Sequence, residues 1–134
     1  MIEAAQAVVE FNRDLLKIAP RPICPMTQDE YKHIIKAFME EIRELQEGWA
    51  EEDVVAMVDA KIDLIYFAIG GLYKCGLSPD QIAACFFAVH AANMVKAVGK
   101  VSRRETGSVP DAVKPDGWPD PKVEITKILG LAGE

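Results

Sequence analysis

Apolar residues recur at intervals of three and four along most of this chain, which is the pattern of amphipathic α-helices. The first stripe predicts a helix over residues 2–18, with Ala4, Val8, Phe11, Leu15 and Ile18 on its apolar face. Three prolines follow and predict an extended connection. A second helix is predicted from Thr27 to about Glu47, because Thr27 and Glu30 have capping-box spacing.

A third helix is predicted from residues 51–53 to about Lys74, with Gly76 as its C-cap. The Gly70-Gly71 pair within it costs about 1 kcal/mol per glycine in helix propensity. Close approach by another helix would offset that cost. From Leu64 to Tyr73 this helix carries no charge on any face, which favours burial at a subunit interface.

The pattern Ser78-Pro79-Asp80-Gln81 predicts the capped start of a fourth helix, which we expect to run to about Val98. Residues 101–121 contain four prolines and two glycines and predict an irregular segment. A short final helix is expected over residues 122–129. The predicted fold is all-α: a single domain over residues 1–134, with a four-helix bundle core and an extra N-terminal helix (about 2–98), and an irregular C-terminal tail (99–134), in an oligomeric protein.

Acidic residues fall at helical spacing within this pattern. Glu41 and Glu44 share one face of the second helix, and Asp59 and Asp63 share one face of the third. If Gly48-Trp49-Ala50 forms a tight connection, the two helices are antiparallel and the two pairs lie level. Four facing carboxylates repel one another unless they are protonated or bound to cations. Such a set of oxygen ligands suits Mg²⁺ or Mn²⁺.

A run of charges such as that around Glu40 also has a simpler explanation as a solvated helix face. Glu40 with Lys36, and Glu47 with Arg43, have the spacing of surface ion pairs, and we favour that explanation for both glutamates. Asp59 and Asp63 instead lie among valine, isoleucine and leucine residues, where we expect limited exposure.

Composition narrows the class of protein. The 134-residue chain is half apolar and has a formal net charge of −6, which argues against a general nucleic-acid-binding surface. Its three cysteines lack a CxxC spacing, and its N-terminal residues lack a basic signal-peptide region. The longest uncharged stretch, residues 81–95, is too short for a membrane span. We therefore expect a cytoplasmic protein that binds neither nucleic acid nor membrane.

A basic cluster follows the fourth helix. Between Ala91 and Arg104 there is no acidic residue, whereas the stretch contains Lys96, Lys100, Arg103 and Arg104. One explanation is favourable interaction with the helix C-terminus. The other is an anion site that binds phosphate oxygens, to which Asn93 contributes a hydrogen bond. Carboxylates for Mg²⁺ together with bases for phosphate indicate a polyphosphate substrate.

Other motifs are absent. The chain has no Walker A sequence, no GxGxxG and no GxSxG, and it lacks the two Glu-x-x-His motifs, one on each of two helices, that di-iron carboxylate proteins need. Trp118 lies among loop residues, where an aromatic ring either stacks on a base or covers the core.

The segments EEIRE (residues 40–44) and VDAKIDLIYFAIG (58–70) resemble the EExxE and ExxD motifs of the MazG-like all-α nucleoside triphosphate pyrophosphohydrolases. This superfamily includes dimeric dUTPases and phosphoribosyl-ATP pyrophosphohydrolases. The segment GLSPDQIAACFFAVHAANMVK (76–96) resembles a phage and bacterial branch, and so do RRETG (103–107) and Lys114–Pro119.

The resemblance implies a helical dimer or tetramer that binds Mg²⁺ and hydrolyses a nucleoside triphosphate to the monophosphate and pyrophosphate. By motif position it implies that Glu41, Glu44 and Asp63 bind metal. The Glu of ExxD falls at Ala60, whereas Asp59 matches an Asp-Ala-x-x-Asp variant, which makes it a fourth ligand. The resemblance also implies that Asn93 and Lys96 contact the substrate.

The interpretation that follows is a Mg²⁺-dependent pyrophosphohydrolase of (deoxy)nucleoside triphosphates that cleans the nucleotide pool. Glu40 or Glu41 is the candidate catalytic base. The expected substrate-binding residues are Asn93, Lys96, Arg103, Arg104, Lys114 and Trp118. Two alternatives remain open: hydrolysis of phosphoribosyl-ATP, and a non-catalytic helical module that binds metal or nucleotide.

Overall fold

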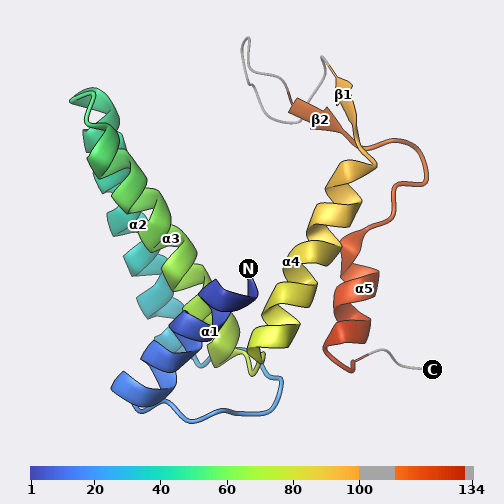
Figure 1. Cartoon of the computed structure of the whole chain (residues 1–134), viewed down its shortest axis with the longest axis horizontal. Helices are drawn as coiled ribbons and strands as arrows, with labels where there is room; N and C mark the ends of the chain where they lie inside the picture. The colour runs from blue at the N-terminus through green and yellow to red at the C-terminus, as the bar shows by residue number, and fades with distance from the viewer. Residues whose placement is uncertain (100–110, 132–134) are drawn as a thin grey trace. The chain divides into compact units, whose positions relative to one another are not determined.

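The computed structural model describes residues 1–99 and 111–131 and is mostly helical, which confirms the all-α class. The chain divides into two compact units, residues 1–82 and 83–134, and each is described by itself. The first unit contains α1 (Ile2–Glu10), a π-helical turn η1 (Phe11–Leu15), α2 (Gln28–Ala50) and α3 (Val54–Lys74), as labelled in Figure 1. The division falls within α4 (Pro79–Met94), and the second unit continues with β1 (Ala97–Gly99), β2 (Asp111–Val113) and α5 (Pro121–Ile128).

The first helix buries only part of the predicted face. Val8 is buried as predicted, together with Ala5 and Val9, whereas Ala4 is exposed and Leu15 is 67% exposed. The exposure of Leu15 follows from the π-helical turn, which changes the angular spacing of the side chains after residue 10. The buried Asn12 amide donates to the Val8 carbonyl at 2.9 Å, so a polar residue is satisfied on the buried face.

Helix α2 begins as predicted but ends later. Thr27 and Glu30 form the capping box, with the Glu30 amide donating to the Thr27 hydroxyl and the Thr27 amide donating to the Glu30 carboxylate. Gly48, predicted to end the helix, lies buried within it, and the helix continues to Ala50. A Cβ on Gly48 would lie 3.1 Å from the Ala56 Cβ. This glycine therefore allows α3 to approach α2 closely instead of ending the helix.

The connection between α2 and α3 consists of residues 51–53, not 48–50 as predicted. Glu52 adopts the left-handed conformation, with φ of 56°, and Asp53 caps α3 by accepting a hydrogen bond from the Ala56 amide at 3.0 Å. The predicted start of α3 is confirmed. Figure 1 shows α2 and α3 packed side by side as an antiparallel hairpin.

The glycines of α3 and its C-terminus permit close contacts. A Cβ on Gly71 would lie 2.6 Å from the Ile34 side chain of α2, and one on Gly70 would lie 3.3 Å from the Asn12 amide. The close approach predicted for a neighbouring helix backbone is made here by side chains. Gly76, with φ of 92°, ends the helix as predicted, and a Cβ there would overlap the Pro22 carbonyl.

Helix α4 begins at the predicted capping box, in which Ser78 and Gln81 exchange hydrogen bonds of 2.9 and 3.2 Å. It ends at Met94 and not at Val98, because residues 97–99 pair with 111–113 as a two-stranded antiparallel ladder. Sequence patterning missed these strands. Helix α5 is confirmed within one residue of its predicted bounds, with Asp120 as its N-cap.

The most buried apolar side chains of the first unit come from α1, α3, the segment after α3 and the start of α4. They are Ala5, Val8, Val9, Ala60, Ile69, Tyr73, Leu77 and Ile82. The Tyr73 hydroxyl donates to the Ile18 carbonyl at 2.6 Å and so ties the end of the first helical segment to α3. No helix in the described part of the chain has the length and apolar character that a membrane span needs.

Candidate functional site

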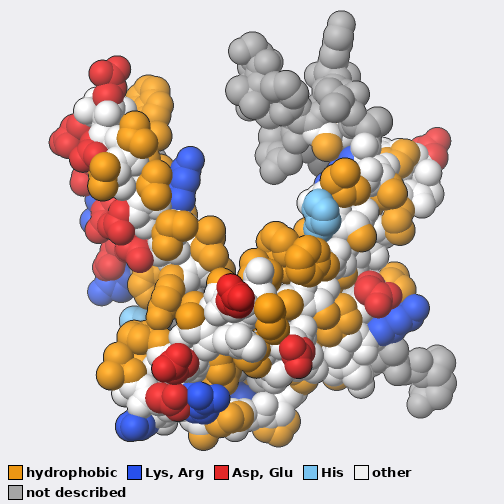
Figure 2. Space-filling view, viewed as in Figure 1, with side chains coloured by type: hydrophobic (Ala, Val, Ile, Leu, Met, Phe, Trp, Pro, Cys, Tyr) orange, Lys and Arg blue, Asp and Glu red, His pale blue; other side chains and the backbone are white. Residues whose placement is uncertain are grey.

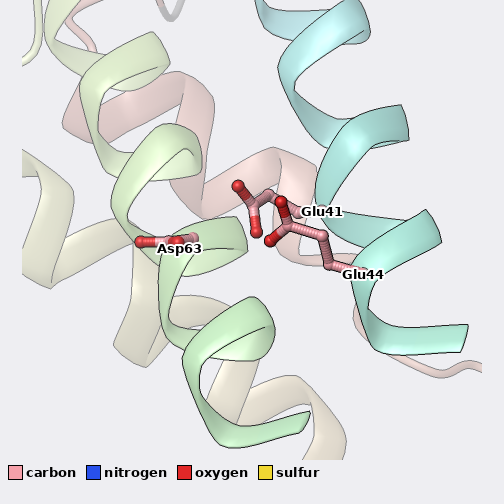
Figure 3. A group of neighbouring side chains, drawn as sticks. All are labelled: Glu41, Glu44 and Asp63. Atoms are coloured by element: carbon pink, nitrogen blue, oxygen red, sulfur yellow. The ribbon is translucent and has the colours of Figure 1, made fainter. Parts of the chain in front are cut away.

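Three carboxylates converge between α2 and α3. Glu41 and Glu44 extend from α2 toward α3, which carries Asp63 (Figure 3). One oxygen from each residue lies within 4.8 Å of one from each of the others. The spacing of three on α2 brings both glutamates to one face, and the antiparallel hairpin brings that face level with Asp63. We call these three residues the carboxylate group.

Glu41 is the buried member of this group. Glu41 is 9% exposed, and its Oε2 has no hydrogen-bond partner among the residues that the structure describes. Burial raises the pKa of Glu41 to about 7, and hydrogen bonding with Glu44 together with the charges of Glu44, Asp63 and Asp59 acts in the same direction. A buried carboxylate oxygen without a donor is costly, so this site favours either a proton or a cation on Glu41.

The composition of the carboxylate group fits a hard divalent cation. Its three ligands are all carboxylate oxygens, with no histidine or thiolate, which is the donor set of Mg²⁺ and Mn²⁺. Glu44 is exposed and Asp63 is half-buried, so one side of the group remains open to solvent. A cation held there would satisfy the unpartnered oxygen of Glu41 and still be accessible to a phosphate ligand.

Two acidic residues predicted for the site lie outside the carboxylate group. Asp59 is exposed, contrary to the expectation that its surroundings would limit exposure, although its charge still contributes to the raised pKa of Glu41. The antiparallel arrangement brings Asp59 to the predicted height along the helix axis. Because Asp59 lies four residues before Asp63, however, its side chain is rotated about the axis by about 40° relative to that of Asp63. Glu40 is exposed and lines a shallow groove of about 310 Å³ with Lys36 and Arg43, as the solvated-face explanation predicts.

The predicted phosphate-binding residues that the structure describes lie in the second unit. Asn93 is exposed near the end of α4, and Lys96 is half-buried just beyond it. The ammonium groups of Lys96 and Lys114 lie 5.0 and 4.5 Å from the centroid of the Trp118 ring. The fold thus brings together three residues whose contact the sequence pattern did not predict: Lys96, Lys114 and Trp118. The predicted residues Arg103 and Arg104 lie outside the described residues.

The helical fold and the carboxylate group together define an all-α protein with an acidic site suited to a divalent cation. Residues 8–93 match the phosphoribosyl-ATP pyrophosphohydrolase family, and the chain belongs to it and thereby to the MazG-like all-α NTP pyrophosphohydrolase superfamily. Membership identifies the chain as a pyrophosphohydrolase. A search of curated proteins found no match.

The matched range includes the carboxylate group and Asn93 but ends before Lys96, Lys114 and Trp118. The contacts of Trp118 are therefore a property of the segment beyond the family match. The available sequence signal was weak: Lys114 and Trp118 flank Pro115-Asp116-Gly117, a turn sequence, but nothing in it shows which part of α4 the indole contacts.

Proposed function

We propose that this protein hydrolyses a (deoxy)nucleoside triphosphate between the α and β phosphates, giving the monophosphate and pyrophosphate, in a Mg²⁺-dependent reaction that cleans the nucleotide pool. The observation that carries the proposal is the buried, unpartnered oxygen of Glu41 within a group of three carboxylates. Family membership supports pyrophosphohydrolase chemistry, and the donor set supports Mg²⁺, with Mn²⁺ as a substitute.

In this proposal Glu41, Glu44 and Asp63 hold the cation, and Asp59 joins as a fourth ligand. When bound, Mg²⁺ would supply charge neutralisation for the pyrophosphate leaving group. Before it binds, the proton on Glu41 must leave, because a cation needs the ionised carboxylate. Glu41 is also the first candidate for the base that orients the attacking water, since a carboxylate beside the cation is well placed to accept a proton from that water. Glu40, one residue earlier, is the second candidate.

The residues proposed to bind the substrate phosphates are Asn93, Lys96 and Lys114, together with Arg103 and Arg104. Ammonium and guanidinium groups bind phosphate oxygens through charge-assisted hydrogen bonds. Among the described residues, the ion pairs are Arg13–Asp14 and Arg21–Glu30, so neither Lys96 nor Lys114 is neutralised by a described carboxylate. Both remain available for an anion.

We further propose that the protein is a homo-oligomer, a dimer or a tetramer. Large apolar side chains remain exposed along the α2–α3 hairpin at helical spacing; they include Tyr31, Ile35, Met39, Ile42, Val55, Val58, Ile62 and Ile65. Figure 2 shows hydrophobic side chains running along this hairpin beside a band of acidic ones. Two such stripes at intervals of three and four residues suit packing against the helices of a second copy.

Phosphoribosyl-ATP is the second candidate substrate, favoured by the description of the matched family. It shares the triphosphate group, so the same carboxylates and lysines would serve. A non-catalytic module, in which the carboxylate group binds a cation only for stability, is the third possibility. The three are separated by incubating the protein and Mg²⁺ with canonical and modified nucleoside triphosphates and with phosphoribosyl-ATP, and measuring released pyrophosphate.

We expect Glu44→Gln or Asp63→Asn to abolish Mg²⁺-dependent pyrophosphate release, because each removes one ligand charge from the carboxylate group. The loss should be at least ~100-fold, as is usual when an electrostatic catalytic group is removed. Glu47→Gln, which removes a charge from an exposed position on the same helix, is the matched control. Unchanged turnover in either ligand variant, with circular dichroism showing an intact helical fold, would reject the metal site. Absence of turnover by the wild-type protein on the whole panel would favour the non-catalytic module.

A further inference from the structure

The indole of Trp118 is held by a hydrogen bond from its N–H to the backbone of α4. Its Nε1 donates to the carbonyl oxygen of Ala92 at 2.7 Å, and the two residues are 26 positions apart. Ala92 is buried and Trp118 is half-buried. The bond satisfies an α4 carbonyl in the last turn, where helical carbonyls lack an intrahelical partner. The ring is therefore fixed in place against the end of α4.

Two ammonium groups lie over this fixed ring. Lys96 Nζ is 5.0 Å and Lys114 Nζ is 4.5 Å from the ring centroid, both within the range of cation–π attraction. Tryptophan is the aromatic side chain with the strongest attraction for cations. Both contacts lie within the second unit and involve only described residues.

The strand register explains why both lysines reach the same ring. In the β1–β2 ladder Ala97 is paired with Val113, so Lys96 and Lys114 occupy the next opposite positions, one residue beyond it. Like charges placed directly opposite on neighbouring strands repel each other. The Trp118 ring offsets part of that repulsion, and an anion between the two ammonium groups would offset the rest.

We propose that Trp118 is a positioning residue that holds Lys96 and Lys114 as a paired-ammonium site for the polyphosphate chain of a nucleotide. The inference rests on the proposed function and adds a role for a segment beyond the family match, which ends at residue 93. It also replaces stacking on a nucleobase as the role of Trp118, because the indole N–H is already bonded and two cations already contact the ring.

The test compares two substitutions of Trp118 that differ in keeping an aromatic ring. Trp118→Leu removes the ring and the N–H, whereas Trp118→Phe keeps an aromatic face for the lysines. We expect Trp118→Leu to raise KM for the preferred nucleotide by roughly 3–10-fold and to leave kcat within about twofold, because a cation–π contact accounts for a change of that order. Trp118→Phe should have a smaller effect than Trp118→Leu, because it keeps the aromatic face and loses only the hydrogen bond to Ala92.

Binding of inorganic triphosphate, measured by calorimetry without nucleotide or metal, tests the paired lysines independently of catalysis. We expect Trp118→Leu and Lys114→Ala to weaken binding several-fold, and Trp118→Phe to weaken it less than Trp118→Leu. Lys122→Ala is the matched control, because it removes an exposed lysine from the same unit that does not contact Trp118. Thermal melts check that each variant is folded.

Equal effects of Trp118→Phe and Trp118→Leu, or no effect of either, would overturn the positioning role. Equal weakening by Lys122→Ala and Lys114→Ala would show that net charge, not the paired site, determines binding, and would overturn it as well. If the wild-type protein hydrolyses no nucleotide, the proposed function fails, and the binding series still decides whether the paired-ammonium site exists.

Discussion

At the scale of single residues, Glu41 determines what the carboxylate group does. Its pKa is raised to about 7 by burial first and by its acidic neighbours second. An ordinary glutamate titrates near 4.5, so between these two values the folded protein binds a proton that the unfolded chain does not. The folded state therefore loses stability as the pH rises through this window, because the buried carboxylate must ionise without a partner.

We predict that the metal-free protein is less stable at pH 8 than at pH 5, with a contribution from Glu41 on the order of 1–3 kcal/mol. Thermal melts in EDTA across this range measure the effect. Glu41→Gln should flatten the profile, because glutamine has no charge to bury, whereas Glu40→Gln at an exposed position should leave it unchanged. Mg²⁺ should raise the melting temperature more at pH 8 than at pH 6, since it competes with the proton. A profile that does not change in Glu41→Gln would contradict this explanation.

The acidic residues show which features of the candidate site the sequence alone can predict. Helical spacing correctly brought Glu41, Glu44 and Asp63 together, because that spacing is a local property of the chain. It did not reveal that Asp59 is exposed or that Glu41 alone is buried. Those differences depend on how α2 and α3 are rotated about their axes, which is decided by packing between helices.

At the scale of helices and strands, the N-terminus of α2 is held by more than its cap. The Arg21 guanidinium contacts the Glu30 carboxylate in a bidentate arrangement, with distances of 2.8 and 3.0 Å. This hydrogen bonding lowers the pKa of Glu30 to about 2, and bonds from Thr27 act in the same direction. The same carboxylate thus caps α2 and fixes the preceding proline-rich connection.

We predict that Arg21→Gln lowers stability at pH 7 by about 1–2 kcal/mol, a value reduced because the pair is partly exposed to solvent. Because the folded pKa of Glu30 is lowered, its stabilisation is complete above about 4.5 and is lost as the pH falls toward 2. Urea titrations at pH 7 and pH 3 measure both effects. Arg13→Gln is the control, because the Arg13–Asp14 pair is about half exposed. An equal loss from the two substitutions would contradict a special role for Arg21.

The starts of the helices were predictable here, whereas the ends of α2 and α4 were not. Thr27, Asp53 and Ser78 cap their helices through contacts within three residues, so the sequence contains the whole signal. The end of α2 was predicted at Gly48, but that glycine instead allows α3 to pack closely against α2. This contact depends on residues outside α2. The β1–β2 ladder was missed for the same reason, since each strand has only three residues and depends on a partner across the irregular segment.

At the scale of the whole molecule, the α2–α3 hairpin leaves many large apolar side chains exposed to water. Ile62 is 55% exposed and Val58 is 54% exposed, and both lie on α3 within the stripe that we assign to a second copy. The uncharged stretch from Leu64 to Tyr73 had already suggested such an interface. Burying these side chains between copies would remove the free-energy cost of their exposure to water.

We predict that the wild-type protein is a dimer or tetramer in solution and that Ile62→Glu shifts it to the monomer, because a charge in an apolar interface is costly. Light scattering coupled to size-exclusion chromatography measures both masses. Val123→Glu is the matched control, since Val123 is 62% exposed on α5 and lies outside the hairpin. A monomeric wild-type protein, or an Ile62→Glu variant with unchanged mass, would contradict the proposed interface.

The short connection of residues 51–53 has a consequence for insertions and deletions. Each residue added to an α-helix turns everything beyond it by about 100°. One extra residue in α3 before Asp63 would therefore point that carboxylate away from Glu41 and Glu44, even if the helix itself remained intact. Seven residues, close to two full turns, would restore the angle if α2 lengthened equally. The hairpin thus tolerates changes of length only in steps that preserve its helical phase.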